Sequence, residues 1–207
     1  MKTCHIFCAA GFDGLVEQIL PGDLVIAADG GFAHTQREQL QPDLVLGDFD
    51  SLGYVPENAR VFPVEKDDTD AMLAVRQGLA QGFDRFLLYG SLDGPRLDHT
   101  VANFQTLQYL ADHGARGWLI GKTHIVTVIQ NDSLEFSGKA AGILSVFCMG
   151  AAAKGVSIRG AQYELEQGTL TAGFPLGVSN HFVNSPGSVR VADGSLLVIY
   201  DRQNGIL

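Results

Sequence analysis

The stretch DLVLGDFDS, residues 43–51, joins a short apolar run to a glycine and two aspartates, Asp48 and Asp50. Similar apolar runs occur elsewhere before residue 130: CHIFCAAG at 4–11, DLVIAADGG at 23–31 and RFLLYG at 85–90. Segments with helical spacing follow several of them, and this alternation is typical of a parallel sheet with crossover helices. The sequence therefore predicts an α/β fold, with a Rossmann-like, three-layer domain of parallel strands at 1–131.

Two amphipathic segments are predicted to be the long helices of this domain. The first has Met72, Val75 and Leu79 at helical spacing. The second carries a longer apolar stripe: Val101, Phe104, Leu107, Leu110 and Ala111. Each stripe is expected to pack against the sheet.

The character of the sequence changes after about residue 132. Glycines become frequent, no long helical pattern appears, and apolar and polar residues alternate in QYELEQGTLTAG and SVRVADGSLLVIY. The pair Asp193-Gly194 between two alternating runs predicts a β-hairpin. We expect an all-β second domain at 132–207.

Composition excludes several classes of protein. The formal net charge is −9 and no basic stripe is present, which argues against a nucleic-acid-binding surface. The apolar runs are far shorter than the roughly 20 residues that a membrane span requires. Cys4, Cys8 and Cys148 form no CxxC pair and are predicted to be reduced, buried thiols. The expected location is the cytoplasm.

Acidic and glycine-rich clusters follow the predicted parallel strands, where ligands bind in open α/β sheets. The clusters are Asp29-Gly30-Gly31, Asp48 to Ser51, Asp67 to Asp70, and Gly90 to His99. Residues i and i+2 of an extended segment share a face, so Asp48 and Asp50 are predicted to point together. A divalent cation removes their mutual repulsion, and carboxylate oxygens suit Mg²⁺. A plain surface turn is the alternative interpretation of this motif.

The remaining clusters carry residues suited to phosphate. Lys66 and Thr69 precede a predicted helix, whose N-terminus favours anions, and Asp70 is placed to reach the metal. Arg96 is predicted to bind phosphate with two parallel hydrogen bonds, and Asp98 adds a carboxylate. The alternatives are helix capping by Asp68 or Thr69 in the first cluster and a surface turn with an Asp cap on the following helix in the second. His99 is interpreted as structural.

Taken together, these motifs resemble the thiamine pyrophosphokinase family, and the likeness extends over nearly the whole chain. The segments that carry it are ADGG at 28–31, GDFDS at 47–51, KDDTD at 66–70, GPRLDHTVAN at 94–103 and GVSN at 177–180. The resemblance implies transfer of the pyrophosphoryl group of ATP to the hydroxyl of thiamine, with release of AMP. It also implies Mg²⁺, a C-terminal β-sandwich, and a homodimer whose sites are shared between chains.

The resemblance assigns roles residue by residue. The metal would be held by Asp48, Asp50 and Asp70, which with Asp98 form the predicted catalytic set. ATP would be contacted by Asp29, Gly30, Lys66, Thr69 and Arg96. Thiamine would be contacted by Ser179 and Asn180, for which a turn between strands is the alternative interpretation.

The chain also departs from the family pattern. Ser91 and Pro95 stand where the family often has glycine, and the single tryptophan, Trp118, lies in the α/β half. Phe174 or Phe182 would then be the aromatic contact to thiamine. Three other functions remain open: a metal-dependent phosphohydrolase, a non-catalytic nucleotide or thiamine sensor, and a pyrophosphokinase with another acceptor, such as a pterin alcohol.

Overall fold

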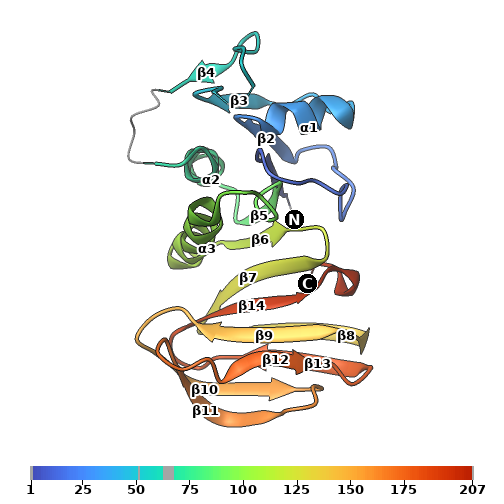
Figure 1. Ribbon diagram of the computed structural model, residues 1–207, viewed down its shortest axis with the longest axis vertical. Helices are drawn as coiled ribbons and strands as arrows, with labels where there is room; N and C mark the ends of the chain where they lie inside the picture. Colours follow the sequence, from blue (N-terminus) through green and yellow to red (C-terminus); the bar gives the residue numbers. More distant parts are fainter. Residues whose placement is uncertain (1, 51, 63–67, 207) are drawn as a thin grey trace. The chain divides into compact units, whose positions relative to one another are not determined.

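The computed structural model describes residues 2–50, 52–62 and 68–206 (Figure 1). The chain divides into two compact units, Met1–Lys122 and Thr123–Leu207. Each unit is described by itself below.

The first unit contains a parallel sheet with the strand order β6-β5-β1-β2-β3-β4. Its strands are β1 (Cys4–Phe7), β2 (Leu24–Ala28), β3 (Leu44–Gly47), β4 (Arg60–Val61), β5 (Arg85–Tyr89) and β6 (Arg116–Ile120). Every residue of β1 and β2 is buried, as expected for strands covered on both faces. The chain order reverses around β1, which pairs with both β2 and β5. The predicted parallel α/β arrangement is confirmed for these strands.

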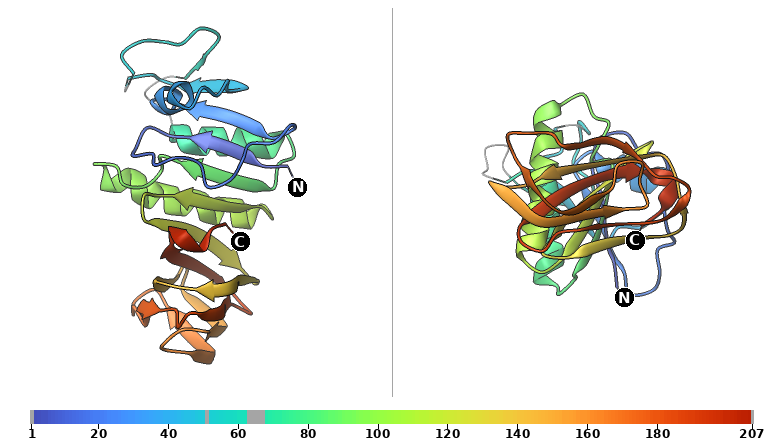
Figure 2. Two further views of the ribbon diagram at one scale, coloured as in Figure 1. Left: turned by 90° about the vertical axis from the view of Figure 1, so that its right-hand side faces the viewer. Right: turned by 90° about the horizontal axis from the view of Figure 1, so that it is seen from below.

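In the described part of this unit, three helices accompany the sheet: α1 (Gly31–Arg37), α2 (Asp70–Ala80) and α3 (Leu97–Asp112). Helices α2 and α3 pack against each other and against the sheet, and α1 lies on the opposite side of the strands (Figures 1 and 2). At Gly78 of α2, an added Cβ would lie 2.5 Å from the ring of Phe86 and 2.9 Å from the Cys4 sulfur. The glycine therefore lets α2 approach the strands closely.

The buried faces of the helices differ in part from the predicted stripes. Helix α2 buries Ala71, Ala74, Val75 and Gly78, and α3 buries Asn103, Thr106, Leu107 and Leu110. Val101, which was predicted to face the sheet, is 49% exposed. The buried face of α3 therefore includes two polar residues, Asn103 and Thr106. A stripe of apolar residues in the sequence does not indicate them.

The second unit consists of antiparallel strands in two sets. One set has the order β12-β9-β14-β7, formed by Gly177–His181, Ile143–Cys148, Ser195–Asp201 and His124–Gln130. The other has the order β11-β10-β13-β8, formed by Leu165–Thr171, Ala152–Arg159, Ser185–Arg190 and Ser133–Ala140. Only the short 3₁₀ helix Arg202–Asn204 interrupts this pattern among the described residues of the unit.

Two details of the predicted second domain are corrected. Strand β7 pairs along its whole length with β14, so it belongs to the second unit, although the predicted boundary at 131/132 placed it in the first. Asp193-Gly194 does not form a hairpin, because β13 pairs with β8 and β10 whereas β14 pairs with β7 and β9. Gly194, with φ 106°, turns the chain from one sheet to the other.

No helix among the described residues is long and apolar enough to cross a membrane. The three cysteines are free, with Cys4 and Cys8 buried and Cys148 partly so.

Candidate functional site

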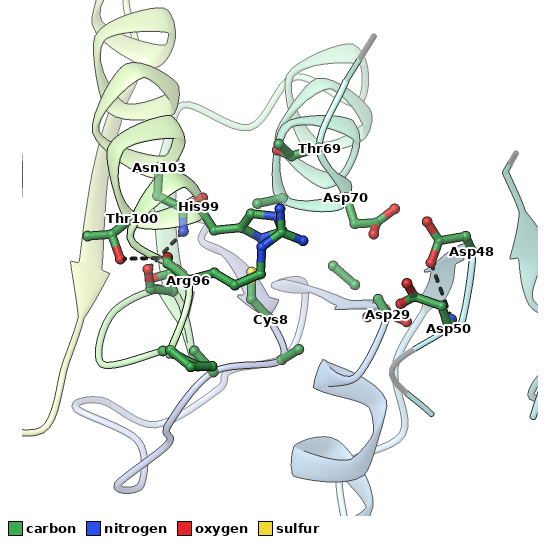
Figure 3. Close-up of a pocket in the computed structure, with 18 of the residues that line it drawn as sticks. Cys8, Asp29, Asp48, Asp50, Thr69, Asp70, Arg96, His99, Thr100 and Asn103 are labelled. Atoms are coloured by element: carbon green, nitrogen blue, oxygen red, sulfur yellow. Dashed lines mark hydrogen bonds between the residues drawn. The ribbon is translucent and has the colours of Figure 1, made fainter. Parts of the chain in front are cut away.

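A pocket of about 790 Å³ lies at the carboxyl ends of β1, β2, β3 and β5 (Figure 3). This is the position at which the strand order reverses and at which open α/β sheets bind ligands. Six of the predicted site residues line it: Asp29, Asp48, Asp50, Thr69, Asp70 and Arg96. Lys66, Asp67 and Ser51 lie outside the described residues.

Asp29 is the most buried acidic residue of the pocket. It follows β2 directly, its side chain and backbone are only 7% exposed, and its backbone has a left-handed φ of 49°. Its N–H donates to the Leu46 carbonyl at 2.8 Å, while its Oδ1 has no hydrogen-bond partner among the described residues. A buried carboxylate oxygen without a partner is costly unless a ligand satisfies it.

Asp29 lies beside Asp48 and Asp50. One carboxylate oxygen from each residue falls within 4.8 Å of the other two, a spacing that suits a single cation. Asp70 lines the same pocket, and its carboxylate faces Asp48 (Figure 3), although it is not part of this group of three. Clustered hard oxygen donors are the ligands that Mg²⁺ takes in proteins.

The turn that brings Asp48 and Asp50 together differs from the predicted one. Strand β3 ends at Gly47, and Phe49 has a left-handed φ of 62°. The Phe49 ring is 3% exposed and packs against Ala27 and Val45. The two carboxylates therefore share a direction because a turn is anchored in the core between them, whereas strand alternation was the expected cause. The Asp50 N–H donates to Asp48 Oδ1 at 3.3 Å.

Gly47 lets the two acidic segments approach each other. A Cβ at this position would lie 3.0 Å from both the Cα and the N of Asp29. Its φ of 147° also belongs to the region that favours glycine. The glycine of the GDFDS motif is thus a packing requirement for the acidic group.

Thr69 caps helix α2. Its Oγ1 accepts a hydrogen bond from the Met72 N–H at 3.2 Å, so the capping interpretation holds, and the residue also lines the pocket. Asp70, in the first turn, is favourably placed at the positive end of the helix dipole. Gly30 is the N-cap of the short helix α1 next to Asp29, and it does not line the pocket.

Arg96 and Asp98 form an exposed ion pair. Arg96 Nη2 donates to Asp98 Oδ2 at 2.6 Å, and Nε donates to Oδ1 at 3.3 Å. This hydrogen bonding lowers the pKa of Asp98 below its ordinary value and raises the pKa of Arg96. Arg96 lines the pocket, whereas Asp98 is not among the lining residues, so the structure places Asp98 next to Arg96 and apart from the other carboxylates.

The sequence analysis missed Thr100 and Asn103 and interpreted His99 as structural. All three residues line the pocket from the first two turns of α3, and the helical spacing of GPRLDHTVAN could have indicated Thr100 and Asn103. Asn103 Nδ2 donates to the Ser91 carbonyl at 2.8 Å, which fixes the loop that carries Arg96 to α3. Cys8 also lines the pocket, and burial, with the nearby Asp70 and Asp29, raises its pKa to about 12. Its thiol is therefore protonated at neutral pH.

Ser179 and Asn180 lie on β12 in the second unit. Ser179 is exposed, has a φ of 59°, and its N–H donates to Ser145 Oγ at 3.1 Å. Asn180 is 5% exposed and its side chain bonds to the backbone of Tyr163. Phe182 is 6% exposed and packs on Phe136 with ring centroids 4.6 Å apart, so it belongs to the core.

Comparison with known proteins identifies both units. Residues 18–119 match the model of the thiamin pyrophosphokinase catalytic domain, and residues 124–196 match that of the thiamin pyrophosphokinase vitamin B1 binding domain. A thiamine pyrophosphokinase of Bacillus subtilis is 26% identical over 215 residues, covering 96% of this chain and 98% of that protein.

Solved structures agree in fold. The crystal structure of thiamine pyrophosphokinase from Bacillus subtilis has a TM-score of 0.83 at 24% identity, covering 97% of this chain and 99% of that one. The thiamin pyrophosphokinase of Geobacillus thermodenitrificans has a TM-score of 0.78 at 22% identity, with 96% and 97% covered. That of Candida albicans has a TM-score of 0.74 at 13% identity, with 97% and 89% covered. With the catalytic and vitamin B1 binding models matched in order along most of its length, the chain belongs to the thiamin pyrophosphokinase family.

Proposed function

We propose that the protein transfers the pyrophosphoryl group of ATP to the hydroxyl of thiamine, giving thiamine diphosphate and AMP. The observation that carries the proposal is the acidic group of Asp29, Asp48 and Asp50 in the pocket of a chain that matches both family models. In this proposal the first unit binds ATP and the metal, and the second unit binds thiamine. The finer description of the folds, Rossmann-like and sandwich, is proposed with it.

The pocket fits Mg²⁺. The unpartnered, buried Oδ1 of Asp29 would be satisfied by a cation, and the neighbouring carboxylates of Asp48 and Asp50 would add two further protein ligands. When bound, Mg²⁺ would offset the negative charge of the triphosphate and the charge that develops on the leaving oxygen. Asp70 faces this group and is proposed as a further acidic residue of the metal site.

The chain's own residues would then position the reactants. Arg96, Thr69 and Lys66 are proposed to contact the phosphates, with Arg96 exchanging its bond to Asp98 for a phosphate oxygen. The hydroxyl oxygen of thiamine attacks the β-phosphorus, the bond from that phosphorus to the bridging oxygen of AMP breaks, and the hydroxyl proton passes to a carboxylate of the pocket. Holding the two reactants in line supplies much of the acceleration.

Thiamine is proposed to contact the second unit at Ser179 and at an aromatic side chain. Tyr163 and Phe174 are 66% and 65% exposed, whereas Phe182 is buried. Tyr163 is the better candidate because its backbone is held by the buried side chain of Asn180, in the same motif as Ser179. Its ring would stack on the planar, positively charged acceptor.

A homodimer in the cytoplasm completes the proposal. Exposed apolar side chains of the second unit support a partner chain: Tyr163, Phe174, Leu176, Val178 and Val183. The catalytic motifs lie in one unit and GVSN lies in the other, which fits sites shared between two chains. Three free cysteines fit a reducing compartment.

The test is to incubate the protein with ATP, Mg²⁺ and thiamine and to measure AMP and thiamine diphosphate by chromatography. The expected result is equal amounts of both products, with no AMP when thiamine is omitted. AMP or ADP formed at the same rate without thiamine would instead identify a phosphohydrolase. Binding of both substrates without turnover would identify a sensor, and turnover only with a pterin alcohol would identify another acceptor.

A further inference from the structure

Strand β12 contains a bulge at the GVSN motif. Gly177 pairs with Val146, but Asn180 pairs with Leu144, so the register shifts between the two positions. Ser179, at the shift, has a left-handed φ of 59° and donates its N–H to Ser145 Oγ at 3.1 Å. Bulges of this kind re-aim neighbouring side chains. Here Ser179 is exposed and Asn180 is turned inward, with only 5% of its surface accessible.

The inward side chain of Asn180 uses most of its hydrogen-bonding capacity within the unit. Its Oδ1 accepts from the Tyr163 N–H at 3.0 Å and from the His181 N–H at 2.9 Å. Its Nδ2 donates to the Tyr163 carbonyl at 2.6 Å. A carboxamide oxygen has two acceptor positions and its nitrogen two donor positions, so one N–H remains on a buried group. This leaves Asn180 little capacity to bind a ligand directly.

Asn180 holds Tyr163 as a neighbouring strand would, through both the N–H and the carbonyl of one residue. The contacts beside it continue this connection: Gln162 N–H donates to the His181 carbonyl at 2.8 Å, and Ala161 forms a bridge with Phe182. Tyr163 is 66% exposed, and its hydroxyl accepts a long hydrogen bond of 3.5 Å from Gln162 Nε2, so packing in the unit contributes little to its orientation. The position of the ring therefore depends on the backbone that Asn180 fixes.

We infer that Asn180 is a positioning residue that sets Tyr163 for the acceptor, and that it does not contact thiamine itself. The inference rests on the proposed function, and it reassigns a residue that the sequence motif alone suggests as a ligand contact. The GVSN motif then has two separate tasks. Ser179 is presented to the ligand by its left-handed backbone, and Asn180 holds the backbone of Tyr163 in place.

Kinetic measurements on single and double variants test this assignment. Asn180→Asp keeps the shape of the side chain but replaces the Nδ2 donor by a carboxylate oxygen facing the Tyr163 carbonyl. We expect the KM for thiamine to rise about tenfold, the magnitude of one lost buried hydrogen bond, with kcat and the KM for ATP changed less than twofold. Asn184→Asp is the matched control, because it makes the same chemical change at an exposed residue of the same region and should leave all three constants unchanged.

The double variant separates positioning from direct contact. In a Tyr163→Ala background, Asn180→Asp should raise the KM for thiamine no further, because both changes remove the same contribution. Additive effects would show that Asn180 binds thiamine directly and would overturn the inference, as would an unchanged KM in Asn180→Asp alone. If Asn180→Asp melts below the assay temperature, Asn180→Ser, which keeps an acceptor for the Tyr163 N–H, replaces it with the same expectations.

Amide exchange at Tyr163, measured by NMR without substrates, keeps this test apart from that of the proposed function. The Tyr163 N–H should exchange at least tenfold faster in Asn180→Asp than in the wild type. Unchanged exchange overturns the positioning role even if the enzyme is active. If exchange is faster in Asn180→Asp but the wild type shows no thiamine-dependent turnover, the proposed function is contradicted while the connection between Asn180 and Tyr163 stays in place.

Discussion

Among single residues, Asp29 has the least usual environment in the catalytic unit. It combines a left-handed backbone, near-complete burial and a carboxylate oxygen without a partner among the described residues. The group it forms with Asp48 and Asp50 concentrates negative charge in one place. In the absence of a cation this repulsion opposes folding, and under the proposed metal binding Asp29 would stabilise the protein only with the metal bound.

The first prediction follows from this repulsion. Asp29→Asn should lower turnover at least a hundredfold and should raise, or leave unchanged, the melting temperature in the presence of a chelator. The measurements are turnover as a function of Mg²⁺ concentration and thermal melting with EDTA. Asp84→Asn, which removes a charge from an exposed residue, is the control and should change neither. Full activity of Asp29→Asn at low Mg²⁺ would show that Asp29 is not a metal ligand.

At the scale of secondary-structure elements, the end of β3 and its turn determine the geometry of the pocket. Gly47 ends the strand, Phe49 anchors the turn in the core, and the carboxylates on either side of Phe49 lie beside Asp29. The glycine is required twice, for its φ of 147° and for its closeness to the backbone of Asp29.

A second prediction concerns this glycine. Gly47→Ala should destabilise the protein by about 2 to 4 kcal/mol, since it adds a steric overlap with Asp29 to the cost of a strained φ. Gly114→Ala is the control, because Gly114 also has a positive φ, 71°, but a Cβ there would meet no atom within 4 Å. Urea denaturation should show that Gly114→Ala lowers the free energy of unfolding by only about 1 kcal/mol. Equal costs for the two variants would show that crowding at Gly47 is unimportant.

Strand β1 carries a buried histidine, and the shift of its pKa predicts that stability depends on pH. His5 Nε2 lies 3.4 Å from Asp23 Oδ2, and burial lowers the pKa of His5 below 6.5 despite the nearby carboxylate. Burial would raise the pKa of Asp23, but hydrogen bonds from the Leu20 and Thr3 N–H groups and from His5 outweigh it, so that the pKa falls below 3.8.

The third prediction states the pH windows that result. The folded state keeps His5 neutral, whereas the unfolded chain takes up a proton near pH 6.5, so stability is full above that pH and falls as the pH drops toward the folded pKa. The contribution of Asp23 persists to lower pH and is lost as the pH falls through its own folded pKa. Melting temperatures at pH 7.5, 6 and 5 should therefore decrease, and His5→Phe should flatten this decrease. An equal slope in the variant would exclude His5 as its cause.

The elements also show which parts of the fold can be predicted from sequence. Apolar runs such as 24–28 and 86–89 identify buried parallel strands, because strands covered on both faces are nearly continuously apolar. Hydrophobic periodicity does not report the sign of φ at Phe49 or Ser179, and those two residues aim Asp48, Asp50 and Asn180. Pairing between distant strands is equally invisible to local signals, which is why Asp193-Gly194 was wrongly predicted to be a hairpin.

At the scale of the whole molecule, the catalytic and thiamine-binding functions are proposed to reside in different units and to meet between two chains. A two-fold dimer would contain two such sites, each with one unit from either chain. The division of the family models, at 18–119 and 124–196, is the basis of this arrangement.

The fourth prediction tests shared sites by mixing variants. Asp50→Ala and Ser179→Ala, each expected to be inactive alone, are refolded together in equal amounts. Half of the dimers should be mixed, each with one site that carries both changes and one that carries neither, so about a quarter of wild-type activity should return. Sites built within one chain would give no recovery. Mixed dimers that are shown to form and yet stay inactive would contradict shared sites while leaving the pyrophosphokinase reaction intact.

The place of β1 inside its sheet has a consequence for biosynthesis. Residues 4–7 leave the ribosome before either of the strands with which they pair, 24–28 on one side and 85–89 on the other. A nascent chain that has not reached residue 89 must carry an apolar strand with one unpaired edge, open to association with other chains. Closing this gap requires contacts between residues about 80 positions apart, so the α/β unit should fold slowly and late in translation. The chain is most vulnerable to aggregation while that central ladder still lacks its second partner.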